Sequence, residues 1–217
     1  MYYIIGDIHG CVDNLDNLYD NIKKEIKDDD TLIFLGDYID RGPSSFDVIE
    51  QLIYISENYN TIFLKGNHED MFLKFKSGNY DFQNYIDNGG MTTLRSYKEN
   101  RGNSSLPHKH QLFFENLIHY YETEDFIAVH AGLNPKINTI NDQSEYDMIW
   151  IRDNFYRKEK KWGKTIIFGH TPCNILHGKM NSIFYNDKNN IIGIDTGACY
   201  GGLLTCLRWP DKIIFQG

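Results

Sequence analysis

Side chains of the types that can bind metal ions follow five apolar segments of this chain, each beside a glycine or alanine. They are Asp7 and His9, then Asp37 and Asp40, then Asn67 and His68, then His130, and then His170. Each segment has the length and composition of a buried strand. Because ligands bind outside the carboxyl ends of the strands in an open α/β sheet, we expect these side chains to converge on one edge.

The residue types at that edge indicate a class of metal. A single aspartate after a strand is usually a turn or helix-cap residue. Five such positions that carry oxygen or nitrogen ligands, and no cysteine, indicate a metal site instead. Mixed carboxylate, imidazole and amide ligands suit manganese, iron or zinc, whereas an all-oxygen magnesium or calcium cage would not use three histidines.

The elements that must position these residues alternate between strand and helix patterns. Apolar segments typical of strands occupy Tyr2–Ile5, Thr31–Leu35, Thr61–Leu64, Phe126–Val129, Thr165–Phe168 and Ile191–Ile194. Leu15, Leu18 and Ile22 have helical spacing, and Pro43 is placed to open a second helix. This β-α-β-α-β order predicts an α/β fold with a largely parallel sheet covered on both faces.

Two further parts of the chain have their own patterns. Leu203–Leu207 and Lys212–Phe215 are predicted to form a closing hairpin. From Glu69 to about His119 the pattern is helical, with a turn at Asn88–Gly90. We interpret this part as a helical cap inserted around residues 71–121 of a single domain that spans residues 1–217.

The bulk composition excludes some classes of protein. The formal net charge is −8 and no Lys/Arg-rich tract occurs, which argues against binding through nucleic-acid phosphates. The four cysteines form no CxxC pair, so we expect free thiols in a reducing cytoplasm. We expect no signal peptide, because Met1–Asp7 leads directly into a strand-like segment without a basic stretch or a cleavage site. No apolar run reaches the roughly 18 residues needed to span a membrane. We therefore expect a cytoplasmic monomer that binds neither membranes nor nucleic acid.

The motifs around these residues also resemble a known family. Three blocks are similar to the signature blocks of the phosphoprotein phosphatase branch of the calcineurin-like metallophosphoesterases, namely Gly6–Gly10, Gly36–Gly42 and Gly66–Glu69. The later histidine blocks of that branch match His130–Gly132 and Gly169–Pro172. Small bacterial and phage members resemble the chain further at Asn88–Gly90, Trp150–Arg152 and Ile194–Gly197.

The resemblance implies a fold and a two-metal centre. The fold would be a sandwich of two sheets flanked by helices, with the cap inserted. Asp7 and His9 would hold one metal ion, Asn67, His130 and His170 would hold the other, and Asp37 would bridge the two. A carboxylate between two dications about 3.5–4 Å apart screens their repulsion. We expect two Mn²⁺ ions, with iron or zinc as alternatives, and a water shared by them that loses its proton and attacks phosphorus directly.

The remaining roles concern the phosphate and the leaving group. Arg41 and Arg152 are candidates for binding the phosphate, because a guanidinium matches two phosphate oxygens. His68 is the candidate general acid for the leaving oxygen, with Asp40 holding its imidazole.

Two substrate classes stay open. Asp40–Gly42 resembles the serine/threonine protein phosphatases, which favours a phosphorylated protein or peptide, with dual specificity also possible in that class. Asp195–Gly197 together with Tyr200–Trp209 is similar to the end of the diadenosine tetraphosphatases, which favours a nucleotide. The symmetrical hydrolases of that type commonly carry Ala where this chain has Asp40, and they are longer. The protein phosphatase is therefore the main expectation, with bis(5'-nucleosyl)-tetraphosphatase as the alternative.

Overall fold

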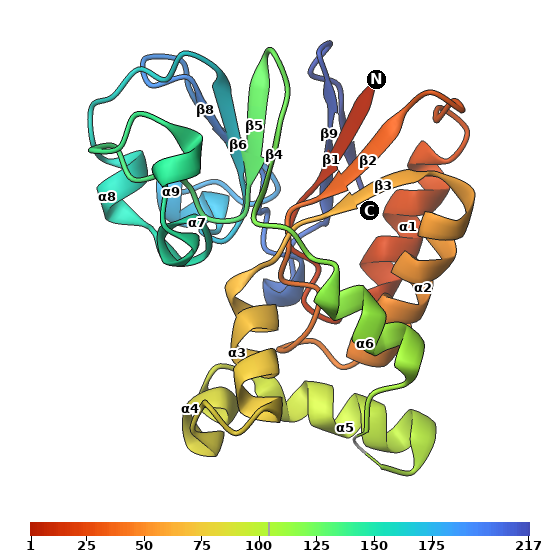
Figure 1. Ribbon diagram of the computed structural model, residues 1–217. Coiled ribbons are helices and arrows are strands. Elements are labelled where there is room, and N and C mark those ends of the chain that lie inside the picture. Colours follow the sequence, from red (N-terminus) through yellow and green to blue (C-terminus); the bar gives the residue numbers. More distant parts are fainter. Residues whose placement is uncertain (104) are drawn as a thin grey trace.

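The computed structural model describes residues 1–103 and 105–217 and contains two five-stranded sheets that face each other (Figure 1). The strand order is β10-β9-β1-β2-β3 in the first sheet and β4-β5-β6-β8-β7 in the second. This arrangement confirms the α/β fold with two sheets and flanking helices that the family resemblance implies. The strand–helix alternation alone predicts only one largely parallel sheet.

Each sheet combines three neighbouring parallel strands with two further strands that pair in antiparallel fashion. In the first sheet β1 (Tyr2–Ile5), β2 (Thr31–Phe34) and β3 (Asn60–Phe63) are parallel, and β9 (Thr205–Trp209) and β10 (Ile214–Gln216) complete it. In the second sheet β5 (Phe126–Val129), β6 (Thr165–Phe168) and β8 (Ile191–Gly193) are parallel, with β4 (Tyr120–Glu122) and β7 (Phe184–Asn186) at its edges. The carboxyl ends of the parallel strands therefore lie on one side of each sheet.

Helices cover the outer faces of both sheets. The first sheet is flanked by α1 (Val12–Ile22) and α2 (Ser45–Asn58), and the second by α7 (Glu145–Trp150), α8 (Asp153–Tyr156) and α9 (Cys173–His177) (Figure 1). Two short 3₁₀ helices, η1 (Ile140–Asp142) and η2 (Ala198–Tyr200), lie in the connections.

Alternation along β1 explains how one sheet serves two cores. Tyr3 and Ile5 are buried among the residues of α1 and α2, whereas Ile4 is buried with Phe126 and Ile167 of the second sheet. Successive side chains of a strand point to opposite faces, so a strand that is apolar throughout can be buried on both sides. A third core lies between the second sheet and the helices outside it.

Four helices continue from the carboxyl end of β3. They are α3 (Asn67–Lys76), α4 (Phe82–Asp87), α5 (Gly90–Arg101) and α6 (His108–Glu115). Figure 1 shows α3, α4 and α5 below the ends of the strands. Gly89 has a φ of 96°, which places the predicted turn at Asn88–Gly90 at the start of α5. That this segment acts as a cap over a substrate stays a prediction.

The structure differs from the sequence prediction in several places. The first strand of the predicted hairpin, Leu203–Leu207, lies two residues too early. The observed β9 ends at Trp209, which pairs with Tyr2 and extends the strand beyond the apolar run. The edge strands β4 and β7 are not predicted, because short and partly polar edge strands give little apolar signal. None of the described helices has the length and apolarity needed to cross a membrane.

Candidate metal centre

The loops after β1, β2, β5 and β6 and the start of α3 bring the predicted ligands together. Two groups of buried side chains have ligand atoms within 4.8 Å of one another: His9, Asp37 and His68 form one, and Asp37, His130 and His170 form the other. Asp37 is common to both groups. The two triads can therefore hold a pair of metal ions with the Asp37 carboxylate between them.

The position of Asp37 depends on a strained turn. Its φ of 52° lies in the left-handed region, which a residue other than glycine seldom adopts. Its backbone carbonyl accepts hydrogen bonds from the backbone N–H groups of Ile8 and His9, which ties the loops after β1 and β2 together. One carboxylate oxygen, Oδ2, lies 3.4 Å from Nε2 of His9 and 3.4 Å from Nε2 of His130.

Backbone carbonyls orient two of the histidines toward that carboxylate. Nδ1 of His9 lies 3.0 Å from the Ile39 carbonyl oxygen, and Nδ1 of His130 lies 2.9 Å from that of Leu35. A carbonyl only accepts, so the proton of each neutral ring belongs on Nδ1 and the lone pair on Nε2 faces the site. Metal-binding histidines are typically oriented in this way.

Asp7 and His170 come from different sheets and meet at a close approach of the backbone. Oδ2 of Asp7 accepts a hydrogen bond from the His170 backbone N–H at 2.9 Å. A Cβ on Gly169 would lie 2.1 Å from Oδ1 of Asp7, so only glycine fits there. Oδ1 of Asp7 and Nε2 of His170 are both buried without a hydrogen-bond partner, as expected of atoms that bind a cation.

The electrostatics of the site reflect crowded, buried charges. Burial alone would raise the pKa of Asp37, but the imidazoles of His130 and His68 outweigh it and lower the pKa well below its usual value. Burial would lower the pKa of His130, but the Asp37 carboxylate raises it to about 9. Burial, and then the Asp195 carboxylate, raise the pKa of Asp7 well above its usual value. Cations bound among these carboxylates would favour their ionised forms.

His68 has two possible roles by geometry alone. Its ring belongs to one of the two triads, and its Nε2 is buried without a partner. Its Nδ1, however, lies 2.8 Å from Oδ2 of Asp40, and both side chains are fully buried. Asn67 precedes it at the start of α3 and places Oδ1 3.0 Å from Nε2 of His130. The predicted ligand set is thus brought together, whereas the division between ligand and acid stays a proposal.

The two arginines contact histidines of different triads. Nη1 of Arg41 is 2.6 Å from Nε2 of His9, the atom that would bind a metal ion, so the guanidinium must turn away when His9 does so. Nη1 of Arg152 donates to the carbonyl oxygen of His170 at 3.3 Å and to Oγ1 of Thr171 at 3.2 Å. Both guanidinium groups therefore border the triads, although neither is held by a carboxylate there.

Two buried carboxylates of the site were given no role from the sequence. Glu69 accepts hydrogen bonds from the backbone N–H groups of Gly66, Asp37 and Tyr38 at 2.8–3.0 Å, which holds the turn at Asp37 in place. Burial, and then the charge of Asp37, raise the pKa of Glu69 to about 7. Burial raises the pKa of Asp195 to about 6 despite a hydrogen bond from the Gly197 backbone N–H. Both residues belong to the motif blocks, and this was the signal available for them.

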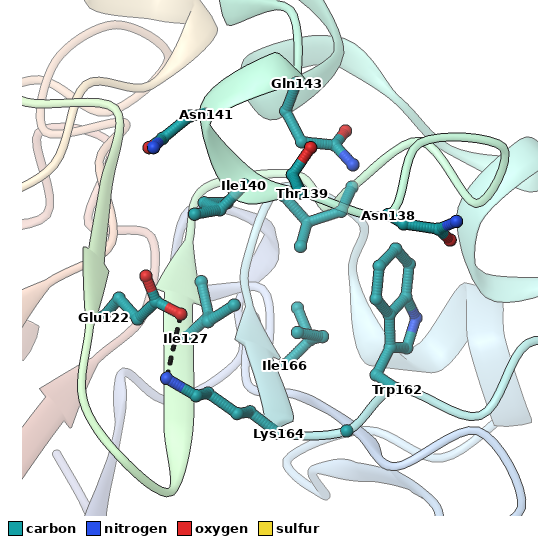
Figure 2. Close-up of a pocket in the computed structure, with 12 residues that line it drawn as sticks. Glu122, Ile127, Asn138, Thr139, Ile140, Asn141, Gln143, Trp162, Lys164 and Ile166 are labelled. Carbon is teal, nitrogen blue, oxygen red and sulfur yellow. Dashed lines mark hydrogen bonds and ion pairs between the residues drawn. The ribbon is translucent and has the colours of Figure 1, made fainter.

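A surface hollow of about 380 Å³ lies elsewhere, on the second sheet beside η1 (Figure 2). Ile127 and Ile166 form part of its floor, and Trp162 lines one side. Its polar side chains bind protein groups: Lys164 pairs with Glu122 at 2.9 Å, for example. None of the predicted metal ligands lines it.

Comparison with known proteins agrees with this geometry. The family model for calcineurin-like phosphoesterases matches residues 2–202. The chain belongs to that family and is a metal-dependent phosphoesterase.

Individual relatives carry more specific names. The asymmetrical bis(5'-nucleosyl)-tetraphosphatase PrpE of Oceanobacillus iheyensis is 28% identical over an alignment of 235 residues. The alignment covers 96% of this chain and 88% of that enzyme. A crystal structure of a candidate diadenosine tetraphosphatase superposes with a TM-score of 0.71 at 22% identity, covering 100% of this chain and 92% of the other. A serine/threonine phosphatase from Saccharomyces cerevisiae gives a TM-score of 0.61 at 17% identity, over 100% of this chain and 79% of that one. These two structural likenesses bear on the fold alone.

Proposed function

We propose that this protein is an asymmetrical dinucleoside tetraphosphate hydrolase. The observation that carries the proposal is the similarity to PrpE enzymes along nearly the whole chain. The nucleotide alternative is therefore better supported than the protein phosphatase that is the main expectation from the sequence. Asp40 differs from the Ala common in symmetrical hydrolases, whereas these relatives are named asymmetrical. An unequal cut of a tetraphosphate bridge leaves a nucleoside triphosphate and a nucleoside monophosphate.

Exposed aromatic side chains beside Arg41 and near His170 suit a substrate with two bases. Tyr200 is 57% exposed, and the guanidinium of Arg41 lies 5.6 Å from its ring centre. Near His170, Tyr146 is 68% exposed and stacks on Trp150, whose ring meets His170 edge-on at 6.1 Å. Stacking of a base on an aromatic ring contributes about 1–3 kcal/mol. A nucleotide can stack its base on these rings, and a bare phosphate has no base that could gain this binding energy.

The proposed roles follow from the contacts above. Two divalent ions, expected to be manganese, would be held by six side chains: Asp7, His9, Asp37, Asn67, His130 and His170. When bound, the ions supply an activated water and screen the charge of the phosphate chain. Arg41 and Arg152 would bind the phosphate oxygens. His68, aligned by Asp40, would donate a proton to the leaving oxygen.

Product analysis tests this proposal. The Mn²⁺-loaded protein is incubated with diadenosine tetraphosphate, and the nucleotides are separated by anion-exchange chromatography. We expect ATP and AMP in equal amounts at early times. ADP as the sole product would exclude the asymmetrical cut, and absence of hydrolysis would exclude a dinucleotide substrate.

A second candidate function is hydrolysis of phosphoserine or phosphothreonine in proteins. The buried pair of Asp40 and His68 favours it, because an alkoxide is a poor leaving group and needs a general acid. A nucleotide phosphate is a weaker base and needs the acid less. Phosphoserine and phosphothreonine peptides in the same assay separate the two functions: turnover of peptides without turnover of the dinucleotide would reverse the order proposed here.

A further inference from the structure

The Asp40 carboxylate is held by more than its histidine. It is fully buried, and Oδ2 lies 2.8 Å from Nδ1 of His68. Oδ1 accepts hydrogen bonds from the hydroxyl of Tyr85 at 2.7 Å and from that of Thr93 at 2.5 Å. Thr93 also accepts the Asp40 backbone N–H at 2.9 Å and faces Oγ of Ser45 at 2.9 Å. Each oxygen of the carboxylate thus has a fixed partner.

The two hydroxyls come from the helices below the sheets. Tyr85 belongs to α4 and Thr93 to α5, and both are fully buried. The turn between these helices contributes a further contact, because the Gly89 carbonyl oxygen accepts the Arg41 backbone N–H at 3.2 Å. Asp40 and Arg41 have φ values of 69° and 68°, so the loop after β2 is held in a left-handed conformation where α4 and α5 contact it.

We propose that Tyr85 and Thr93 are positioning residues that fix the Asp40 carboxylate and, through it, the imidazole of His68. Without them the carboxylate could rotate about χ2, a torsion with broad preferences. Burying a polar oxygen without a hydrogen-bond partner also costs free energy, and the two hydroxyls remove that cost at Oδ1. The helices α4 and α5 then complete the catalytic machinery instead of only covering it. This inference rests on the acid role proposed above for His68.

The chain offers a matched control for Tyr85. Tyr97 is also a buried tyrosine, lies on α5, and places its hydroxyl 2.7 Å from Nδ1 of His110. His110 in turn lies 2.8 Å from Glu50, on α2. Tyr97→Phe therefore removes one buried hydroxyl bonded to a buried group, as Tyr85→Phe does, but away from Asp40. A purely structural contribution should appear in both variants.

The first experiment compares leaving groups in the metal-loaded protein. Tyr85→Phe, Thr93→Val, Tyr97→Phe and His68→Asn are assayed on p-nitrophenyl phosphate, a good leaving group, and phenyl phosphate, a poorer one. For Tyr85→Phe and Thr93→Val we expect kcat on phenyl phosphate to fall by roughly 10-fold or more, with KM unchanged and a smaller loss on the activated ester. Tyr97→Phe should match the wild type on both esters, and Thr93→Ser, which keeps the hydroxyl, should restore the rate.

The second experiment observes the contact without turnover. In the zinc-loaded protein, which is diamagnetic, the Nδ1–H proton resonance of His68 is assigned by its absence in His68→Asn. We expect it to shift or exchange faster with solvent in Tyr85→Phe and to stay unchanged in Tyr97→Phe.

The outcomes separate this inference from the role on which it rests. The rate loss of His68→Asn can depend on the leaving group while Tyr85→Phe and Thr93→Val behave like Tyr97→Phe. If the His68 resonance also does not move in Tyr85→Phe, the positioning role is wrong. If His68→Asn loses no more rate on the poorer leaving group, the acid role itself is wrong.

Discussion

The metal centre and the hollow of Figure 2 are both lined by polar side chains, but they differ in what those side chains bind. In the hollow, Lys164 pairs with Glu122, and Gln143 donates to the backbone carbonyls of Asn134 and Ile137. In the metal centre, Oδ1 of Asp7 and Nε2 of His68 and His170 are buried without partners. Leaving a buried polar atom unsatisfied costs about 1–3 kcal/mol, more if it is charged.

This difference teaches where to expect chemistry in the molecule. Only one other buried side-chain atom without a partner is found in the described part of the chain, Nε1 of Trp209. The remaining three gather at the carboxyl ends of the strands, where a bound cation or substrate would complete them. A hollow whose polar groups already bind one another lacks this requirement, whatever its volume.

The largest effect is expected at Asp37. Asp37→Ala removes the carboxylate shared by both triads, so metal binding and turnover should fall together, the rate by more than about 10³-fold. Metal content by mass spectrometry and steady-state kinetics check this. Asp30 provides the control, because it is a buried aspartate that pairs with the N-terminal amine at 2.6 Å. It precedes β2, whereas Asp37 follows the opposite end of that strand. Asp30→Ala should reduce stability but not metal content.

The second effect concerns His68, the one triad member with a carboxylate partner on Nδ1. His68→Asn should lower kcat by a factor on the order of 10²–10⁴ while two metal ions stay bound. His110→Asn, which alters another buried histidine, is the control, and it should keep both the kcat and the two bound metal ions of the wild type. Loss of one metal ion from His68→Asn would instead make His68 a ligand, as its place in the triad permits.

The sequence predicts the strands and the candidate ligands of the metal centre but not all of the residues that support them. The strands follow from apolar runs, and the ligands follow from motif blocks at the ends of those runs. Glu69 and Asp195 lie within the same blocks, but their roles depend on which backbone N–H groups and charges surround them after folding. Tyr85 and Thr93 could not be found, because neither residue lies in a motif block and their contact with Asp40 arises only from the packing of α4 and α5.

A smaller effect is expected at Asp195, whose contribution to stability should depend on pH. The pKa of Asp195 is raised to about 6 in the folded protein, against about 3.9 in the unfolded chain. Between these values the folded state holds a proton that the unfolded state has released, so this group's contribution to stability falls as the pH rises through that window. Asp195→Asn removes the penalty present above about pH 6.

We therefore expect metal-free Asp195→Asn to gain on the order of 1–3 kcal/mol relative to the wild type at pH 7.5, and little at pH 4. Urea unfolding at the two pH values in the presence of a chelator measures this. A stability difference that does not change with pH would contradict the raised pKa.

The smallest effect is expected in the hollow. Lys164→Met breaks the ion pair with Glu122, in which both side chains are about one-third exposed. Pairs of this kind contribute about 0–1 kcal/mol, so stability should change little and kcat and KM should stay within about twofold of the wild type. A large loss of activity would remove the contrast between the two regions.

Metal removal and return tests the two-metal centre most directly. The wild-type protein is dialysed exhaustively against a chelator and then titrated with Mn²⁺ while phosphate ester hydrolysis is followed. We expect activity to fall to background after dialysis and to reach its plateau when about two ions per chain have bound, in keeping with the two triads that share Asp37. Full activity of the metal-free protein would contradict a metal-dependent mechanism at this site.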